Sequence, residues 1–354
     1  MTNADSHLIP VRPAHRFDEA RLAAYLAGPL GDPGPVTVLQ FQGGQSNPTF
    51  RLDTRAGRFV LRKKPPGPLL PSAHQVEREY RIIAALHGSD VPVPRPLLLC
   101  EDADVIGTPF YIMECVEGRI LSQPDLAGMD PDERAAVYDA MNATLAALHR
   151  TDWAALGLGD FGRTDRYLAR QIARWTRQYR ASLVGDADPV MEALAVWLAD
   201  SIPADGATAI AHGDFRLGNL IFAPDAPRVA AVLDWELSTL GDPLGDLAYC
   251  CLPYRLPAGA AGVKGLMGLD LPALGIPDED SFIAAYCRRT GRDGIGGWSF
   301  YLAFSLFRLA AILQGVHARA VQGNASSADA LEVGQRAALL ARTAHALALG
   351  KGNG

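Results

Sequence analysis

Cysteine is scarce in this sequence, and its spacing rules out several kinds of site. Among 354 residues there are five cysteines, with no CxxC pair and no spacing typical of a zinc site. They are Cys100, Cys115, Cys250, Cys251 and Cys287. This pattern excludes a disulfide-stapled secreted scaffold and favours reduced, buried thiols. We therefore expect an intracellular, cytoplasmic protein.

An excess of positive charge is also missing. Lys and Arg number 33 against 39 Asp and Glu, for a formal net charge of -6. A general nucleic-acid binder normally carries a basic balance or a dense basic patch. We therefore expect no nucleic-acid partner.

From the sequence we expect neither a signal peptide nor a membrane-spanning helix. Its first ten residues, MTNADSHLIP, are polar. The most apolar stretch, residues 298–313, is interrupted by Ser305 and Arg308. It falls short of the roughly 20 residues that a spanning helix needs. We interpret it as a core helix and expect no membrane partner.

The first hundred residues alternate like a small antiparallel sheet. A helix is expected at residues 18–26, followed by three strands at residues 36–42, 49–54 and 58–64. A capping box from Ser72 to Gln75 predicts a helix at residues 72–88. Two further strands, at residues 97–100 and 109–116, complete a predicted lobe of five strands, an N-terminal helix and one more helix.

The turn GGQSNP between the first two strands contains residues that suit phosphate binding. Gly43 and Gly44 would let backbone N–H groups approach a phosphate, and Ser46 and Asn47 would add polar contacts. Glycines are also common in hairpin turns that have only a structural role. Both interpretations stay open.

Glu79 falls on the apolar face of the helix at residues 72–88. At 100° per residue it lies among Ile82, Ile83 and Leu86. A buried carboxylate needs a partner, and the neighbouring strand offers Arg62, Lys63 and Lys64. We expect an ion pair, which either ties helix to sheet or orients a phosphate-binding cation.

After a hinge near residues 114–119 the chain becomes strongly helical. The first helix of this part starts at a cap formed by Asp130 and Glu133. These patterns predict an α+β fold of two lobes, a small antiparallel β lobe at residues 1–116 and a larger, mainly helical lobe at residues 117–354.

The segment AIAHGDFRLGNLIFAPDAPRVAAVLDWE combines an Asp-x4-Asn pair with a second Asp on a returning strand. The midpoint between Asn219 and Asp234 falls in the turn PDAPR, so the two should face each other across a hairpin. Their side-chain oxygens are ligands that Mg²⁺ takes alongside water and phosphate. Asp214, in the loop before the hairpin, is the candidate base for an incoming hydroxyl.

This ordered series resembles the aminoglycoside phosphotransferase and choline kinase-like family. The matching elements run from GGQSN through VLR, VEREY and YIMECVEG to HGDFRLGN and LDWE. The resemblance implies a protein-kinase-like fold and the transfer of a phosphate from ATP, with Mg²⁺, to a hydroxyl of a small molecule. By the same resemblance Asp214 is the catalytic Asp, and Asn219 and Asp234 are the metal ligands.

The resemblance also assigns the nucleotide-binding residues. Glu79 is the helix carboxylate that holds the phosphate-binding basic residue, and Arg62 occupies the position of that basic residue, with Lys64 as a rival. Glu114 and Val116 match the hinge that meets adenine. Arg216, two residues after Asp214, is a candidate for contact with the γ-phosphate. His212 and Asp246 are expected to brace the loop.

The chain departs from the protein kinases in having Asp234-Trp235-Glu236 in place of DFG, with no APE motif. This disfavours a protein kinase. An inactive, nucleotide-binding pseudokinase remains the alternative of another class.

An anionic acceptor is suggested by a run of arginines. On a helical wheel they form one stripe, opposite Leu168, Ile172, Trp175 and Tyr179. They are Arg163, Arg166, Arg170, Arg174 and Arg177. RYLARQIARW, VLRKKPPG and LPSAHQVEREY further resemble the subgroup fused to acyl-CoA dehydrogenases, which implies a hydroxyacyl-CoA acceptor. A solvated helix face is the plainer interpretation, and aminoglycoside or choline-like acceptors are the alternatives.

Overall fold

In the computed structural model, residues 8–42, 47–66, 74–204, 206–259, 264–321 and 330–350 are described. The chain divides into two compact units. Unit 1 comprises Met1–Leu121, Ala155–Leu158 and Gly218–Ser238, and unit 2 comprises Ser122–Ala154, Gly159–Leu217 and Thr239–Gly354. The hairpin of residues 218–238 thus belongs with the N-terminal part of the chain. The boundary expected after residue 116 stays a prediction.

Unit 1 is built on a six-stranded antiparallel sheet with the order β1-β2-β3-β4-β6-β5. Its strands are β1 (Leu8–Pro10), β2 (Thr37–Phe41), β3 (Thr49–Thr54), β4 (Gly57–Lys63), β5 (Pro96–Cys100) and β6 (Phe110–Glu114). The predicted meander of three strands is β2-β3-β4 and is confirmed. The sixth strand, β1, was not predicted, because it is three residues long and ends in a proline at the sheet edge.

The helices of unit 1 are α1 (Glu19–Leu26), α2 (Val76–Leu86) and the short α3 (Ala103–Ile106). α1 starts where predicted, at Asp18, whose side chain accepts a hydrogen bond from Arg21 N–H at 2.9 Å. α2 starts later than predicted: Gln75 is its N-cap and makes no side-chain capping bond. Ser72 lies outside the described residues. The segment between the two predicted strands, residues 101–108, contains α3, with Asp102 as its cap.

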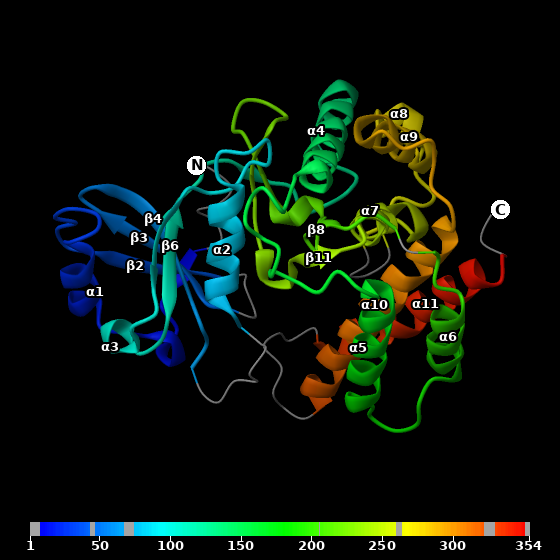
Figure 1. Ribbon diagram of the computed structural model, residues 1–354, viewed down its shortest axis with the longest axis horizontal. Coiled ribbons are helices and arrows are strands. Elements are labelled where there is room, and N and C mark those ends of the chain that lie inside the picture. The colour runs from blue at the N-terminus through cyan, green and yellow to red at the C-terminus, as the bar shows by residue number, and fades with distance from the viewer. Residues whose placement is uncertain are drawn as a thin grey trace. The chain divides into compact units, whose positions relative to one another are not determined.

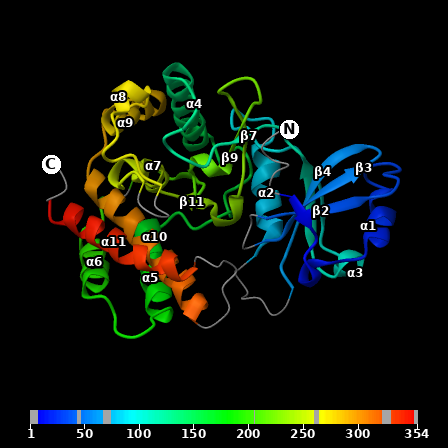
Figure 2. The same cartoon turned by 180° about the vertical axis from the view of Figure 1, so that it is seen from behind.

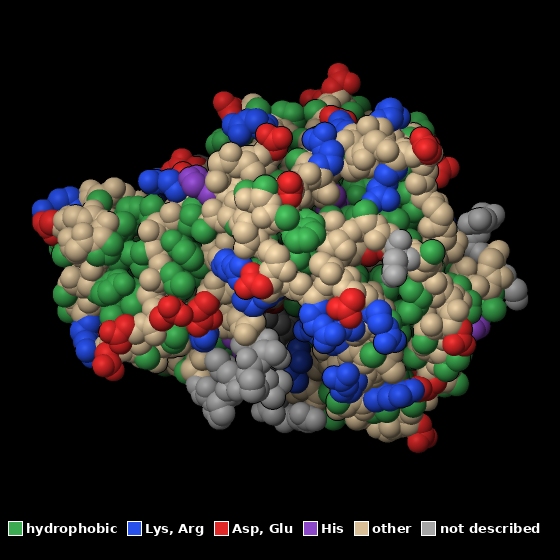
Figure 3. Space-filling model, viewed as in Figure 1, with side chains coloured by type: hydrophobic (Ala, Val, Ile, Leu, Met, Phe, Trp, Pro, Cys, Tyr) green, Lys and Arg blue, Asp and Glu red, His purple; other side chains and the backbone are tan. Residues whose placement is uncertain are grey.

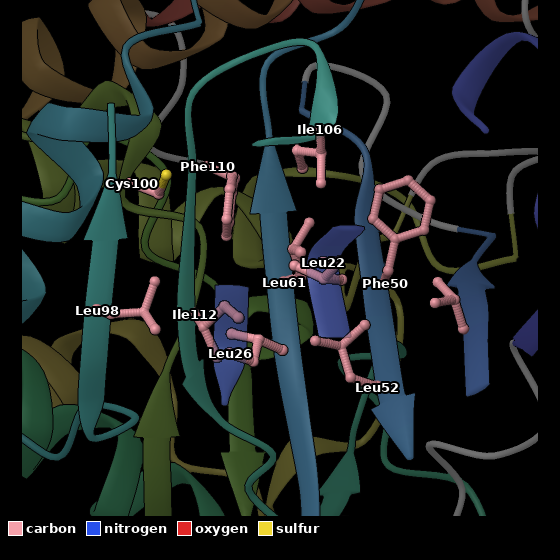
Figure 4. Packing of buried hydrophobic residues seen from close by; sticks show 11 residues of the cluster. Leu22, Leu26, Phe50, Leu52, Leu61, Leu98, Cys100, Ile106, Phe110 and Ile112 are labelled. Atoms are coloured by element: carbon pink, nitrogen blue, oxygen red, sulfur yellow. The ribbon is translucent and has the colours of Figure 1, made fainter. Parts of the chain in front are cut away.

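Alternation along the strands divides the sheet into two faces. One face packs Phe50, Leu52, Leu61 and Ile112 against Leu22 of α1 in a continuous apolar cluster (Figure 4). The alternate residues point to the other face, where α2 lies (Figure 1). α2 therefore faces the side of β4 that carries Arg62.

A three-stranded sheet with the order β10-β9-β7 completes unit 1. Its strands are β7 (Arg119–Ile120), β9 (Leu220–Phe222) and β10 (Val229–Val232). Gly118 precedes β7, and a Cβ atom there would lie 2.2 Å from the carbonyl oxygen of Phe222. Glycine at this position lets β7 approach β9, which carries on directly from Asn219.

Unit 2 is mainly helical, with one two-stranded sheet. Its helices are α4 (Pro131–Arg150), α5 (Tyr167–Ala181), α6 (Pro189–Asp200), α7 (Leu244–Cys251), α8 (Leu271–Leu274), α9 (Glu279–Thr290), α10 (Trp298–Val321) and α11 (Ala330–Ala348), and its strands are β8 (Ala209–Ala211) and β11 (Thr239–Gly241). The predicted cap of α4 is confirmed, since Asp130 accepts from Glu133 N–H at 2.8 Å. A β lobe and a helical lobe are both present, as the α+β prediction requires.

α10 is the central helix of unit 2. It packs against α5, α7 and α11, and α10 and α11 lie side by side in both ribbon views (Figures 1 and 2). At 24 residues it is longer than the apolar run suggested, and by length and composition it could cross a membrane. Two-thirds of its apolar window is buried within the protein, however. A core helix was predicted here, and this burial agrees with it.

Candidate active site

Arg62 and Glu79 form a buried ion pair in unit 1. Strand alternation turns Arg62 of β4 toward α2, and Glu79 stands on the inward side of α2. Nε of Arg62 lies 2.8 Å from Oε2 of Glu79, with the side chains 10% and 2% exposed. Nε makes no hydrogen bond in this contact. The expectation that Glu79 points inward and meets a basic residue is confirmed.

Two neutral side chains also hold Glu79. The amide of Asn47 donates to Oε1 at 2.5 Å, and the Tyr111 hydroxyl donates to Oε2 at 3.1 Å. Burial raises the pKa of Glu79, and Arg62 and these two hydrogen bonds oppose that rise. Burial alone would lower the pKa of Arg62, but the negative charges of Glu79 and Asp234 outweigh this effect and raise the pKa. The guanidinium is therefore a permanently charged group in a fixed place.

Arg62 also reaches the β9–β10 hairpin. Its Nη2 donates to Oδ1 of Asp234 at 2.8 Å and lies 3.5 Å from Oε2 of Glu236. One guanidinium thus contacts three carboxylates, one of which belongs to the candidate metal ligand Asp234.

The hairpin register differs from the prediction by one residue. Val232 pairs with Leu220, and Leu233 N–H donates to the carbonyl oxygen of Asn219 at 2.8 Å. Leu233, and not Asp234, therefore stands opposite Asn219. The expectation was wrong because the ladder begins with Phe222 opposite Val229, a register that alone would place Val232 opposite Asn219. The irregularity between residues 229 and 231 then moves the register one residue toward the predicted one.

Asp234 follows the ladder in a left-handed backbone conformation, with φ 66° and ψ 60°. Such a conformation is uncommon outside glycine and is tolerated best by Asp and Asn. It ends β10 and starts the 3-10 turn Trp235–Leu237. The strained residue is thus the one that carries the carboxylate.

Asn219 and Asp234 offer the oxygen donors for a metal. Asn219 is 6% exposed and ends the 3-10 turn Leu217–Asn219, while the Asp234 side chain is 33% exposed. Within the described ranges no three His, Cys, Asp or Glu side chains gather into a cage. Mg²⁺ is commonly bound by one or two side chains with phosphate and water supplying the rest, so this donor set fits it. The ligand roles stay predictions.

The remaining nucleotide candidates are only partly placed. Gly43, Gly44 and Ser46 lie outside the described residues. Lys64, the rival of Arg62, forms an ion pair with Glu77 instead of Glu79. At the expected hinge, Glu114 N–H already donates to the carbonyl oxygen of Arg95 at 2.9 Å. The adenine contacts of Glu114 and Val116 stay predictions.

In unit 2 the loop after β8 is braced by Asp246 of α7. Asp246 accepts from His212 N–H at 2.5 Å and from Gly213 N–H at 2.9 Å, and its Oδ2 lies 3.5 Å from Nε2 of His149. Burial would raise the pKa of Asp246, but His149 and these hydrogen bonds lower it on balance. The expected bracing role of Asp246 is confirmed.

Asp214 follows directly on this braced loop. Its N–H donates to Nδ1 of His212 at 3.1 Å, and its carboxylate accepts from Nε of Arg216 at 3.2 Å. A hydrogen bond from Tyr249 also reaches the carboxylate, and burial together with Asp214 raises the pKa of the Tyr249 phenol. Asp214 is 18% exposed and Arg216 is 45% exposed. The roles of Asp214 as base and of Arg216 at a phosphate stay predictions.

Tyr249 and Arg308 were not singled out as site residues from the sequence. Arg308 of α10 is 7% exposed and donates from Nη2 to the carbonyl oxygen of Gly213. Its sequence signal was a lone charge inside an apolar run. A lone charge of this kind indicates by itself only that the run is a poor membrane span.

The arginine stripe is shorter than the helical wheel suggested. α5 starts at Tyr167, so Arg163 and Arg166 precede the helix, and Arg166 has φ 48°. Arg163 and Arg170 share Asp165, at 3.4 and 3.5 Å. Lys and Arg side chains nevertheless gather over the region of α5 on the surface (Figure 3). The wheel failed because the helix begins only after the left-handed Arg166, so neither Arg163 nor Arg166 lies on a helical face.

Taken separately, each unit has a recognisable part of a phosphoryl-transfer enzyme. The antiparallel unit holds a Glu–Arg pair linked to an aspartate, and the helical unit holds an aspartate on a braced loop. Together with the fold, these features define a phosphotransferase of the protein-kinase-like class.

The chain belongs to the phosphotransferase enzyme family, whose sequence profile matches residues 37–304. The predicted family and fold are confirmed.

The curated relatives are longer proteins. The chain is 48% identical over 328 residues to the mouse protein "Acyl-CoA dehydrogenase family member 10", covering 92% of this chain and 31% of that protein. Of the rat family member 11 it covers 44%. The chain thus spans less than half the length of these relatives.

Solved structures agree with the fold. A Ralstonia eutropha protein named as a candidate aminoglycoside phosphotransferase is 49% identical, with a TM-score of 0.86 and coverage of 95% of this chain and 99% of that one. APH(4)-Ia, solved with AMP-PNP and hygromycin B, has 19% identity, a TM-score of 0.57 and coverage of 91% and 98%. This second similarity bears on the fold alone.

Proposed function

We propose that the protein transfers the γ-phosphate of ATP, with Mg²⁺, to a hydroxyl of a small-molecule metabolite. The observation that carries the proposal is the Arg62 guanidinium, which lies 2.8 Å from both Glu79 and Asp234. This places a cation that can bind phosphate next to a carboxylate that can bind a metal ion. The AMP-PNP bound to the distant relative APH(4)-Ia supports the choice of nucleotide.

Each residue has a role in this proposal. Arg62 contacts the nucleotide phosphates, for which its planar fork is well suited. Asn219 and Asp234 hold Mg²⁺, which when bound neutralises charge on the phosphates. Asp214 accepts the proton of the acceptor hydroxyl. The hydroxyl oxygen bonds to the γ-phosphorus, the bond from that phosphorus to the β–γ bridging oxygen breaks, and ADP leaves.

For the acceptor we propose an anionic metabolite, with hydroxyacyl-CoA esters as the class to test first. Two of the five arginines of the stripe, Arg163 and Arg170, share the single carboxylate of Asp165, so positive charge is in excess among the described side chains there. The names of the curated relatives point to acyl-CoA chemistry. A polycationic aminoglycoside would be repelled by such a surface. The name of the Ralstonia relative nevertheless makes aminoglycosides the competing class.

The test is phosphate transfer from labelled ATP to hydroxyacyl-CoA, aminoglycoside and choline-like acceptors, with Asp214→Asn as the key variant. We expect its transfer rate to fall by about 10²- to 10⁴-fold, as for loss of a general base. Stabilisation against heating by Mg·ATP should survive, because Arg62, Asn219 and Asp234 are intact. Asp225→Asn makes the same chemical change in the exposed hairpin turn and should leave the rate unaltered.

Other outcomes would contradict the proposal in different ways. Unchanged transfer in Asp214→Asn would remove Asp214 as the base. A preference for a cationic acceptor would overturn the acceptor class. Stabilisation by nucleotide with no transfer to any acceptor would favour the pseudokinase alternative.

A further inference from the structure

Arg308 is a buried cation without a carboxylate partner in the described part of the chain. Its guanidinium carbon lies 5.1 Å from the centre of the Trp175 ring and 5.3 Å from that of Tyr249. Nε makes no hydrogen bond. Burying a charge without an ion pair is costly, and two aromatic faces offset only part of that cost. The energetic cost of burying Arg308 therefore indicates a role beyond packing.

The first contact fixes the backbone just before Asp214. Nη2 of Arg308 donates to the carbonyl oxygen of Gly213, while Gly213 N–H donates to Asp246 at 2.9 Å. Both polar backbone atoms of Gly213 are thus held from different helices, α10 and α7. Gly213 has φ 85°, which only glycine adopts readily. The peptide leading into Asp214 is held in one orientation.

The second contact concerns the carboxylate itself. Tyr249 makes a hydrogen bond to Asp214, and Arg308 packs against the ring of the same tyrosine. Arg216, which also donates to this carboxylate, is 45% exposed. Arg308 thus reaches Asp214 by two routes, through the Gly213 carbonyl and through the Tyr249 ring.

We infer that Arg308 and Tyr249 are positioning residues that hold the Asp214 carboxylate in the orientation needed to take a proton. The inference rests on the proposed function, because it assigns to Asp214 the part of base. A purely structural role would predict a loss of folding stability without a specific loss of turnover rate.

The test compares Arg308→Met, Arg308→Lys and Tyr249→Phe with Arg319→Met, an exposed arginine on the same helix. We expect kcat to fall about 100-fold in Arg308→Met, the size of effect that a misplaced catalytic group produces. In Tyr249→Phe we expect about tenfold, for one lost hydrogen bond to a charged group. Arg308→Lys should lie between them, since it keeps the donor but not the planar stack. KM for Mg·ATP and the rates of Arg319→Met should stay unchanged.

Two further measurements separate positioning from folding and from the proposed function. In the Asp214→Asn background, Arg308→Met should cause no further loss of residual transfer; an equal loss in both backgrounds would overturn the inference. Hydrogen exchange of the peptide spanning residues 209–217 needs no turnover, and we expect it to speed up in Arg308→Met while α11 stays protected. Faster exchange in a protein that transfers phosphate to no acceptor would support positioning and contradict only the proposed function. Should Arg308→Met fail to fold, wild-type kcat in Tyr249→Phe would still overturn the inference.

Discussion

At the scale of single residues, the Arg62 cluster combines stability with function. The guanidinium is 10% exposed and meets Glu79, Asp234 and Glu236. The sequence alone indicated that Glu79 points inward, because helical periodicity places it on the apolar face of its helix. Which of three basic residues it meets was decided by packing, since Lys64 turned to Glu77.

Removing Arg62 should therefore destabilise the fold strongly. We expect Arg62→Met to lower the free energy of unfolding by about 3–5 kcal/mol, because Glu79 is left buried without a counterion. Arg58→Met is the matched control on the same strand. Its ion pair with Glu117 is about half exposed, so we expect a loss of about 0–1 kcal/mol. Urea unfolding measures both, and equal losses would contradict a special role for the buried pair.

At the scale of elements, α7 is connected to the loop after β8 by a single carboxylate. Asp246 accepts two backbone N–H groups of that loop, and residues 212 and 213 are separated from it by more than thirty positions. The sequence resemblance predicted this brace. Its partner His149 on α4 was not predicted, because nothing in the local pattern relates α4 to α7.

This brace has a predictable pH dependence. The folded-state pKa of Asp246 lies below its ordinary value of 3.8, because His149 and hydrogen bonds outweigh burial. A lowered pKa means that the folded state binds the proton less readily than the unfolded chain. The stabilisation is thus fully present above the ordinary value and is lost as the pH falls through the folded value.

In the Asp246→Asn variant we expect the stabilisation of the folded state by this carboxylate to be lost, together with its dependence on pH. We expect a decrease of about 3 kcal/mol in the free energy of unfolding at neutral pH, because the amide can accept only on its oxygen and clashes with one N–H. The difference in the free energy of unfolding between wild type and Asp246→Asn should become smaller as the pH falls through the range in which carboxyl groups titrate. Urea titrations over that range test this, and a constant gap would contradict the assignment.

The elements themselves were largely predictable. The β2-β3-β4 meander, α1 and α4 follow from alternation and capping, which are local properties. The predicted starts of α2 and α5 were too early. In both cases a residue with positive φ, His74 or Arg166, lies just before the helix. Such backbone states are set by surrounding contacts and leave no periodic trace in the sequence.

At the scale of the whole molecule, charge is distributed unevenly. The chain has a net charge of -6, yet the arginines near α5 have little acidic compensation among the described residues. An uneven distribution of this kind attracts an anionic ligand more strongly than net charge suggests. The attraction should weaken as salt screens it.

Two arginines of α5 provide a test of this attraction. Arg177 belongs to the stripe, whereas Arg180 is paired with Glu192. We expect Arg177→Gln to raise KM for hydroxybutyryl-CoA several-fold at low salt, with little effect at high salt and none on KM for ATP. Arg180→Gln should leave both KM values nearly unchanged. Equal effects of the two substitutions would show that the stripe does not recognise the acceptor.

The sequence by itself determined the α+β class, most elements of the small sheet, the inward side of Glu79 and the set of candidate chemical groups. These depend on periodicity, capping and motif spacing, which act over a few residues. Only the tertiary structure decided which groups meet. It placed Arg62 on Asp234, 172 positions along the chain, and Arg308 on Gly213, 95 positions away. It also shifted the hairpin by one residue. Contacts of that kind depend on how packed elements meet, and no local pattern records them.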